Sequence, residues 1–227
     1  MNGANVKWIV NMRRILSLVF PGILLLGIVL LGVRRVIRTE ELWNNFIFNA
    51  DILFVSIMIL WLLYELRVSV CDKEQEKNVS DYGTREIYGF SQSITVLSAL
   101  WVDSFWTNPS ILHVVGFGML LCGISLRFWA IQTLGKYYSH IVRTISGHEI
   151  VDKGPYRYIR HPSYAGMIVA LCGICVLYCN SISVLIFCAL LLPSIVLRIW
   201  IEEKTLLSLD GYEEYVKTRK RLIPYVW

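Results

Sequence analysis

Residues 165–201, AGMIVALCGICVLYCNSISVLIFCALLLPSIVLRIWI, decide the fold class of this chain. The stretch is apolar along almost its whole length, contains Arg198 as its single charged residue, and is interrupted by a short polar turn at 180–183. Apolar helices of about 20 residues are long enough to cross a hydrocarbon layer of about 30 Å. The stretch therefore predicts a hairpin of two membrane-spanning helices, 165–180 and 182–201.

The rest of the chain shares this apolar character. Of its 227 residues, 56% are hydrophobic and 17% are charged, and the mean hydropathy is +0.54. That composition is too apolar for an ordinary soluble domain, and a scattered net charge of +5 argues against a nucleic-acid partner. We predict an all-α fold, a polytopic transmembrane helical bundle of about six spans. The candidate spans are 14–33, 46–66, 87–102, 111–134, 165–180 and 182–201.

Charge asymmetry orients the predicted bundle. Lysine and arginine gather in the segment 135–164 and in the tail after residue 201, whereas 101–126 and 180–183 contain none. Because basic loops stay on the cytoplasmic side of a membrane, we predict a multi-pass protein with both basic segments and both termini in the cytoplasm.

A basic cluster after the first predicted span opposes this orientation: Arg34, Arg35 and Arg38. A first span that does not cross fully would remove the conflict, and both arrangements stay open at this point. We expect residues 1–110 to be N-terminal transmembrane helices without an assigned role, and residues 111–227 to form the functional core.

Cysteines in the fifth span raise the question of a metal site. Cys172, Cys175 and Cys179 share one helical face, but neither histidine nor carboxylate accompanies them at that depth. We interpret them as small packing residues and expect no metal.

A rigid polar stretch stands at the foot of the fifth span. Gly154-Pro155 predicts a turn, two tyrosines follow, and Pro162 suits the first turn of a helix because it lacks an N–H group. The free N–H groups of that helix start favour an anion. The alternative is an interfacial belt, since tyrosine and arginine commonly anchor the ends of membrane helices.

The end of the sixth span carries ionisable residues. Arg198 and Glu202 are four residues apart and share a helical face, whereas we expect Glu203 to point elsewhere. Such residues at the end of an apolar helix are functional candidates; the alternative is a simple ion pair worth a few tenths of a kcal/mol. Together with Arg160 and His161, they form a site of both charge signs, which suits a zwitterionic ligand.

Three motifs at these separations carry a family resemblance. They are GHEIVDKGPYRYIRHPSYAG at 147–166, RIWIEE at 198–203 and YEEYVKTRKRLIPYVW at 212–227. They resemble the isoprenylcysteine carboxyl methyltransferase family of integral membrane enzymes, to which phospholipid methyltransferases are related. The resemblance covers roughly residues 120–227, with a weaker echo in DYGT at 81–84.

The resemblance implies that S-adenosylmethionine binds in a cytoplasmic pocket formed by the segment 135–164 and the C-terminal tail. The implied cofactor-binding residues are His148, Glu149, Ile150, Val151, Tyr156, Arg160, His161, Pro162, Ser163, Tyr164 and Glu202. Arg198 matches the position that meets the methyl acceptor. Where the family has a cofactor-binding glutamine, this chain has Ile141, with His140 beside it.

The chemistry needs positioning above all, because methyl transfer from a sulfonium is an in-line displacement. Glu202 would pair with the cofactor ammonium, and an aromatic face such as that of Tyr164 would lie near the sulfonium. A carboxylate acceptor, ionised above a pKa of about 4, needs no general base, and Arg198 would orient it. An amine or thiol acceptor would instead call on His161 as the base.

We expect an amphiphilic acceptor, either a lipophilic small molecule or a lipidated peptide, and favour a carboxylate like that of isoprenylcysteine. Membrane lipids are the other expected partner. Three alternatives stay open: a phospholipid or amine N-methyltransferase, an NADPH-dependent enzyme like the sterol reductases, and a non-enzymatic membrane scaffold. Sterol reductases share Arg-His-Pro-x-Tyr and a C-terminus like RLIPYVW, but they are normally longer.

Overall fold

The computed structural model describes residues 21–38, 45–71, 83–102, 110–142, 149–223 and 227. Within these residues the regular structure is helical, and the one β feature is an isolated bridge between Ile159 and Lys220. The all-α prediction is therefore confirmed. The chain divides into two compact units, Met1–Arg67 and Val68–Trp227. The predicted functional division at residue 110 stays a prediction.

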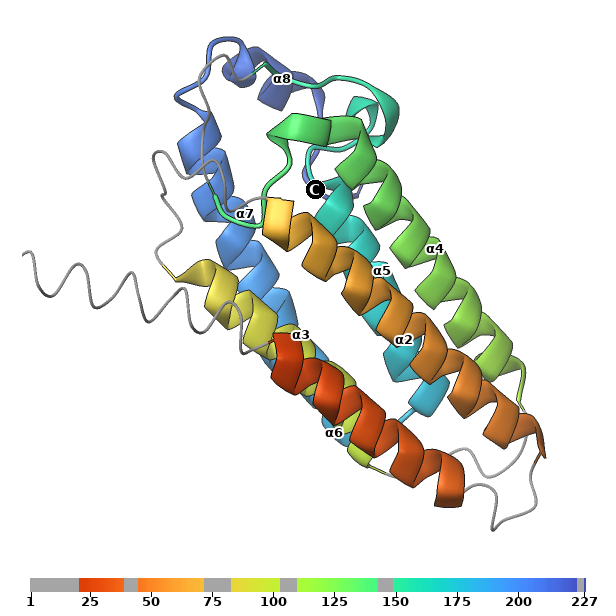
Figure 1. Ribbon diagram of the computed structural model, residues 1–227. Helices are drawn as coiled ribbons and strands as arrows, with labels where there is room; N and C mark the ends of the chain where they lie inside the picture. Colours follow the sequence, from red (N-terminus) through yellow and green to blue (C-terminus); the bar gives the residue numbers. More distant parts are fainter. Residues whose placement is uncertain (1–20, 39–44, 72–82, 103–109, 143–148, 224–226) are drawn as a thin grey trace, which may run out of the picture. The chain divides into compact units, whose positions relative to one another are not determined.

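The described helices coincide with the six predicted apolar segments (Figure 1). They are residues 21–38, α2 (Asn45–Cys71), α3 (Thr84–Trp101), α4 (Ile111–Leu134), α5 (Pro162–Tyr178), and one long helix made of α6 (Ser181–Ile186), η4 (Phe187–Leu191) and α7 (Leu192–Leu206). Short elements complete them: η2 (Gly135–Tyr137), η3 (Gly154–Arg157) and α8 (Tyr212–Thr218).

Two of the described helices are long and apolar enough to cross a membrane, Ile111–Tyr137 and Ser181–Leu206. The helix Pro162–Tyr178 is equally apolar in character but shorter. The count of six spans stays a prediction.

The basic cluster of the first unit lies inside a helix rather than in a loop. The helix described from residue 21 continues to residue 38, so the predicted end at residue 33 was too early. Arg35 Nε lies 3.0 Å from Asp51 Oδ1 on α2, and Asp51 is only 3% exposed. A paired arginine is far less costly in apolar surroundings than an isolated one. The pairing with Asp51 explains how the helix can continue past Arg35, a residue that the sequence pattern assigned to a loop.

In the second unit, α4 and α5 approach each other closely through glycines. A Cβ added to Gly123 would lie 2.3 Å from the Ala170 nitrogen, and one added to Gly166 would lie 2.6 Å from the Gly123 oxygen. Seven residues away, Gly116 and Gly173 form a second contact of the same kind. Small residues allow helix backbones to approach in this way. The contact fixes the start of α5 relative to the C-terminal half of α4.

The long helix changes its hydrogen-bonding pattern just before a proline. A π-helical turn, Phe187–Leu191, precedes Pro193, whose missing N–H cannot continue an α-helical ladder. The helix then continues to Leu206 and carries Arg198 and the two glutamates to its C-terminal end.

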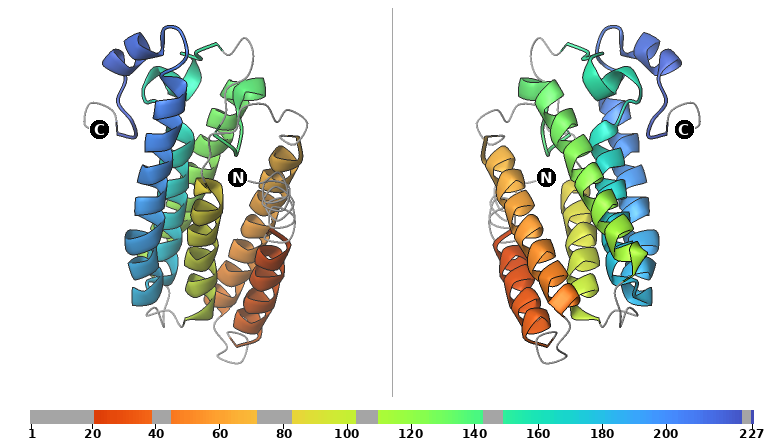
Figure 2. Two further views of the ribbon diagram at one scale, coloured as in Figure 1. Left: turned by 90° about the vertical axis from the view of Figure 1, so that its left-hand side faces the viewer. Right: turned by 90° about the vertical axis from the view of Figure 1, so that its right-hand side faces the viewer.

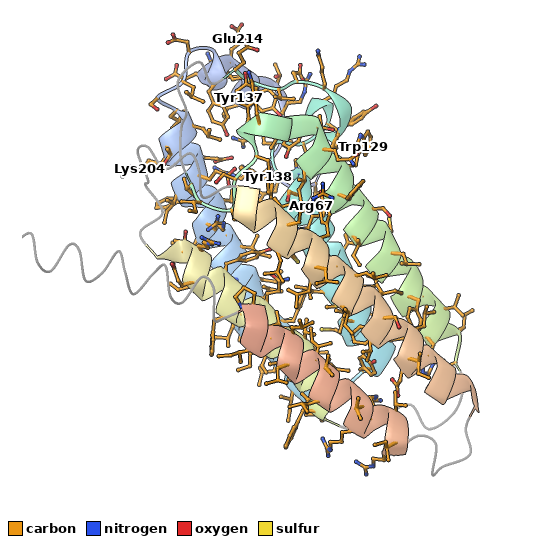
Figure 3. The ribbon with its side chains drawn as sticks, viewed as in Figure 1. Arg67, Trp129, Tyr137, Tyr138, Lys204 and Glu214 are labelled. Atoms are coloured by element: carbon orange, nitrogen blue, oxygen red, sulfur yellow. The ribbon has the colours of Figure 1, made fainter. Side chains whose placement is uncertain are left out.

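The polar segments of the second unit gather at one end. Residues 135–142 and 149–161, the C-terminal end of α7 and α8 lie together there, while the turn between α5 and α6 lies at the opposite end (Figures 1 and 2). Figure 3 shows Tyr138, Lys204 and Glu214 at that same polar end. The two basic segments predicted to meet are therefore close in space. Which side of a membrane they face stays a proposal.

Candidate functional site

The candidate site lies where the start of α5, the last turn of α7 and the C-terminal segment meet. The N–H groups of Arg160 and His161 donate to the carbonyls of Lys220 and Arg221, at 2.8 and 3.0 Å. Pro162 follows as the first residue of α5. The N–H groups of the two residues before Pro162 are therefore engaged by the C-terminal segment. The first N–H group of α5 that donates to a carbonyl of the same turn is that of Ala165, which donates to His161. The N–H groups of Ser163 and Tyr164 precede it and have no intrahelical acceptor.

Glu203 is an integral part of this junction. Its Oε1 lies 2.8 Å from Arg160 Nη1 and 3.2 Å from His161 Nε2, and its Oε2 lies 2.9 Å from Arg221 Nη2. The side chain is 9% exposed. The expectation that Glu203 points away from the site was wrong. The physical reason is that the C-terminal segment folds back over the face of α7 that carries Glu203 and brings Arg221 to it. The apolar pattern of α7 does not indicate what covers that face.

Glu202, the neighbouring carboxylate, has fewer hydrogen-bonding and charged partners than Glu203. Its Oε2 accepts a hydrogen bond from the Tyr164 hydroxyl at 2.7 Å, and its Oε1 lies 3.9 Å from His161 Nδ1, too far for a hydrogen bond. The side chain is 30% exposed. Of the two adjacent carboxylates, Glu203 is thus enclosed by cations, and Glu202 keeps an accessible oxygen.

Arg198 lies one turn deeper and is 3% exposed. Its Nε donates to the Tyr164 hydroxyl at 2.7 Å, and its Nη2 donates to the carbonyl of His140. The guanidinium carbon also lies 5.8 Å from the centre of the Tyr88 ring. The Tyr164 hydroxyl therefore links Arg198 to Glu202, so the two residues predicted to share a face are connected through α5.

Arg127 on α4 is a buried cation that the sequence analysis missed. It is 3% exposed, and it donates to Ser163 Oγ at 2.8 Å and to the Tyr138 hydroxyl at 3.2 Å. The signal was present, because an arginine inside an otherwise apolar helix marks a functional candidate. Arg127 thus connects α4 to the start of α5 beside the site.

Buried tyrosines cover the junction from the side of α8. The Tyr215 hydroxyl donates to the carbonyl of Tyr156 at 2.7 Å. Burial raises the pKa of Tyr156 well above its ordinary value, with the neighbouring Tyr138 as the next cause. Burial also raises the pKa of Tyr212, helped by the carboxylates of Glu203 and Glu202. Both phenols therefore keep their protons to a higher pH than an exposed tyrosine does.

The remaining predicted residues are placed as follows. His148 lies outside the described residues. Glu149 is exposed, Ile150 and Val151 are half-buried, and Pro162 and Ser163 are buried. The contacts above bring together Arg160, His161, Tyr164, Arg198 and Glu202. In the described part of the chain, no group of three His, Cys, Asp or Glu residues could hold a metal ion.

Comparison with known proteins covers the start of α5 and the end of α7, which form most of this junction. Residues 114–208 match the model of the isoprenylcysteine carboxyl methyltransferase family, which confirms the resemblance inferred from the motifs. Protein-S-isoprenylcysteine O-methyltransferase of Schizosaccharomyces pombe is 35% identical over 58% of this chain and 58% of its own length. Protein-S-isoprenylcysteine O-methyltransferase B of Arabidopsis thaliana is 34% identical over 56% of this chain and 61% of its own length.

A bacterial relative matches along nearly its whole length. The uncharacterized protein YpbQ of Bacillus subtilis is 26% identical over 68% of this chain and 95% of its own length. The chain spans about three fifths of the length of the two named methyltransferases.

Proposed function

Because residues 114–208 carry the pattern of the isoprenylcysteine carboxyl methyltransferase family, we propose that this protein transfers a methyl group from S-adenosylmethionine to a carboxylate on a lipidated acceptor. The acceptor is an isoprenylcysteine-like molecule whose apolar tail lies in the membrane. The reaction takes place at the polar end of the second unit, which faces the cytoplasm in this proposal.

The observation that carries the proposal is the chain of contacts from Arg198 through Tyr164 to Glu202. It sets a buried cation and a half-open carboxylate on either side of one phenol. The methyl donor carries an ammonium, which Glu202 would bind, and the acceptor carries a carboxylate, which Arg198 would bind. Because the two protein charges are adjacent, they would hold donor and acceptor in a fixed relation to each other.

The residues present fit the amino-acid end of S-adenosylmethionine. Glu203 is already paired with the guanidinium groups of Arg160 and Arg221 and lies 3.2 Å from His161 Nε2, so Glu202 is the carboxylate left to pair with an ammonium. The N–H groups of Ser163 and Tyr164 at the start of α5 would take the carboxylate of the same ligand. When bound, the cofactor supplies a methyl group activated by a sulfonium.

Arg198 orients the acceptor in this proposal. A guanidinium stays charged when buried and offers a bidentate fork that matches a carboxylate. A carboxylate with a pKa of about 4 is ionised at neutral pH and can act as the nucleophile without a base. Arg198 Nε donates to the Tyr164 hydroxyl at 2.7 Å, and this hydrogen bond fixes the Arg198 side chain.

The position of His161 favours a carboxylate over an amine or thiol acceptor. Its ring is 3% exposed, with Nε2 next to Glu203 and Nδ1 on the side of Glu202. A general base must reach the proton that it removes. A ring enclosed between two glutamates supports a positioning role for His161 better than the role of base.

Binding measurements on the purified full-length protein test the proposed donor. We expect tritiated S-adenosylmethionine to bind and its demethylated product to compete, while NADPH does not compete. Glu202→Gln should abolish most of this binding, whereas Glu213→Gln, on the exposed side of α8, should leave it unchanged. Binding of NADPH in place of S-adenosylmethionine contradicts the proposal and favours a reductase; binding of neither favours a scaffold.

A further inference from the structure

A buried hydroxyl at the start of α8 has no hydrogen-bond partner among the residues that the structure describes. Tyr212 is 4% exposed, and its hydroxyl oxygen is fully enclosed. Buried polar groups are almost always hydrogen-bonded, and leaving one unpaired costs stability. The position therefore calls for a group that the protein itself does not supply.

The face of α8 that carries Tyr212 packs against the segment that leads into the site. Gly211, in the left-handed region at φ 82°, turns the chain into the helix. Tyr212 and Tyr215 are three residues apart and lie on one face of α8, with ring centres 6.0 Å apart. Because the Tyr215 hydroxyl donates to the carbonyl of Tyr156, this face of α8 lies against the segment before α5.

The charged groups acting on Tyr212 are those of the candidate site, namely the carboxylates of Glu203 and Glu202 and the guanidinium of Arg160. Glu203 and Arg160 already pair with each other at 2.8 Å. Glu202 is the member of this group with an accessible oxygen. Tyr212 thus lies within electrostatic reach of Glu202, the carboxylate to which a cationic group would bind.

We propose that the Tyr212 hydroxyl binds the methyl donor, accepting a hydrogen bond from the ammonium of its amino-acid head beside Glu202. This inference rests on the proposed function and extends the site to α8. It explains why a hydroxyl is held in a place where phenylalanine would fill the same volume without an unpaired polar atom. It also means that α8 closes over the amino-acid end of the ligand.

Two ligands that differ only at that end separate this contact from general packing. S-adenosylhomocysteine has the amino-acid head, whereas 5′-methylthioadenosine keeps the adenosine and the thioether but lacks the head. Calorimetry on the full-length protein should show that Tyr212→Phe weakens binding of S-adenosylhomocysteine about tenfold. Binding of 5′-methylthioadenosine should stay unchanged. Tyr158→Phe, at a side chain that is 62% exposed, serves as the matched control and should change neither affinity.

The melting temperature without ligand gives an independent readout. Tyr212→Phe should melt at the same temperature as the wild type or higher, because it removes an unpaired buried hydroxyl. A lower melting temperature, or equal losses for both ligands, overturns the inference in favour of a structural role. Unchanged binding of S-adenosylhomocysteine by Tyr212→Phe also overturns it and leaves the proposed function standing. If the wild type binds neither ligand, the proposed donor fails and the inference fails with it.

Discussion

Adjacent glutamates at the end of α7 have different environments, and this difference is the sharpest feature of the site. Glu203 contacts Arg160, His161 and Arg221, which come from two separate segments of the chain. Glu202 accepts one hydrogen bond, from Tyr164, and keeps an accessible oxygen. We therefore propose that Glu203 holds the site together and that Glu202 binds ligand.

The first prediction separates these two roles. Glu203→Gln should destabilise the protein by about 3 kcal/mol, because it leaves the buried guanidinium of Arg160 and the half-buried one of Arg221 without their counter-charge. Glu202→Gln should leave the melting temperature nearly unchanged but cost about 2–5 kcal/mol of affinity for S-adenosylmethionine. Thermal unfolding and ligand titration on the same preparations check both values. Equal melting temperatures for the two variants would refute the division of roles.

Arg198 carries the second prediction. Arg198→Lys keeps the positive charge but loses the planar fork, so it cannot hold a carboxylate and the Tyr164 hydroxyl together. Turnover of a carboxylate acceptor should fall about 10- to 100-fold, with a much smaller change in affinity for S-adenosylmethionine. Arg157→Lys, at the exposed end of η3, is the matched control. Full turnover by Arg198→Lys would end the acceptor-binding role.

At this scale the sequence predicted part of the site. The four-residue spacing of Arg198 and Glu202 places them on one face, and the two contacts of Tyr164 agree with that. The role of Glu203 could not be predicted, because its partner Arg221 lies eighteen residues further along the chain. Helical spacing carries no information about a segment that folds back from the tail.

At the scale of elements, the closest contact is the glycine-lined interface between α4 and α5. It sets the distance between Arg127 on α4 and Ser163 at the start of α5. Any change that separates the two helices should therefore also move the start of α5, which carries His161 and Tyr164 next to both glutamates.

The third prediction tests this interface. A Cβ at position 123 would meet the Ala170 backbone at 2.3 Å, whereas one at position 118 meets nothing within 4 Å. Gly123→Ala should thus lose about 1–3 kcal/mol of stability through overpacking. Gly118→Ala, on the same helix, should be neutral or stabilising by about 1 kcal/mol, because alanine favours helix. The melting temperatures of the two variants compare them directly, and equal stability would contradict the close approach of the helices.

The helices themselves were predictable, because long apolar runs separated by polar turns indicate them. The predicted end of the first helix was wrong by five residues, since the pattern treats Arg34, Arg35 and Arg38 as loop residues. In the structure Arg35 is helical and forms an ion pair with Asp51 of α2. A hydropathy pattern cannot predict an ion pair between two helices. The π-helical turn before Pro193 was likewise not predicted, although the proline is its physical cause.

At the scale of the whole molecule, the polar and charged segments mark one end of the second unit as the candidate site. The basic segments, the start of α5 and the end of α7 meet there (Figure 1). The match over residues 114–208 covers the whole of α5, α6 and α7 and most of α4. The sequence could predict this convergence from the apolar hairpin, because its two ends must lie side by side.

The most direct measurement is methyl transfer by the purified full-length protein in lipid vesicles. The donor is methyl-tritiated S-adenosylmethionine, and the acceptors are N-acetyl-S-farnesylcysteine and the same molecule with its carboxyl group amidated. We predict that tritium passes to the free acid and is released as methanol by mild alkali, as expected of a methyl ester. The amidated acceptor should remain unlabelled. Labelling of both acceptors, alkali-stable labelling of an amine-containing phospholipid, or no labelling of the free acid by protein that binds the donor would contradict carboxyl methylation.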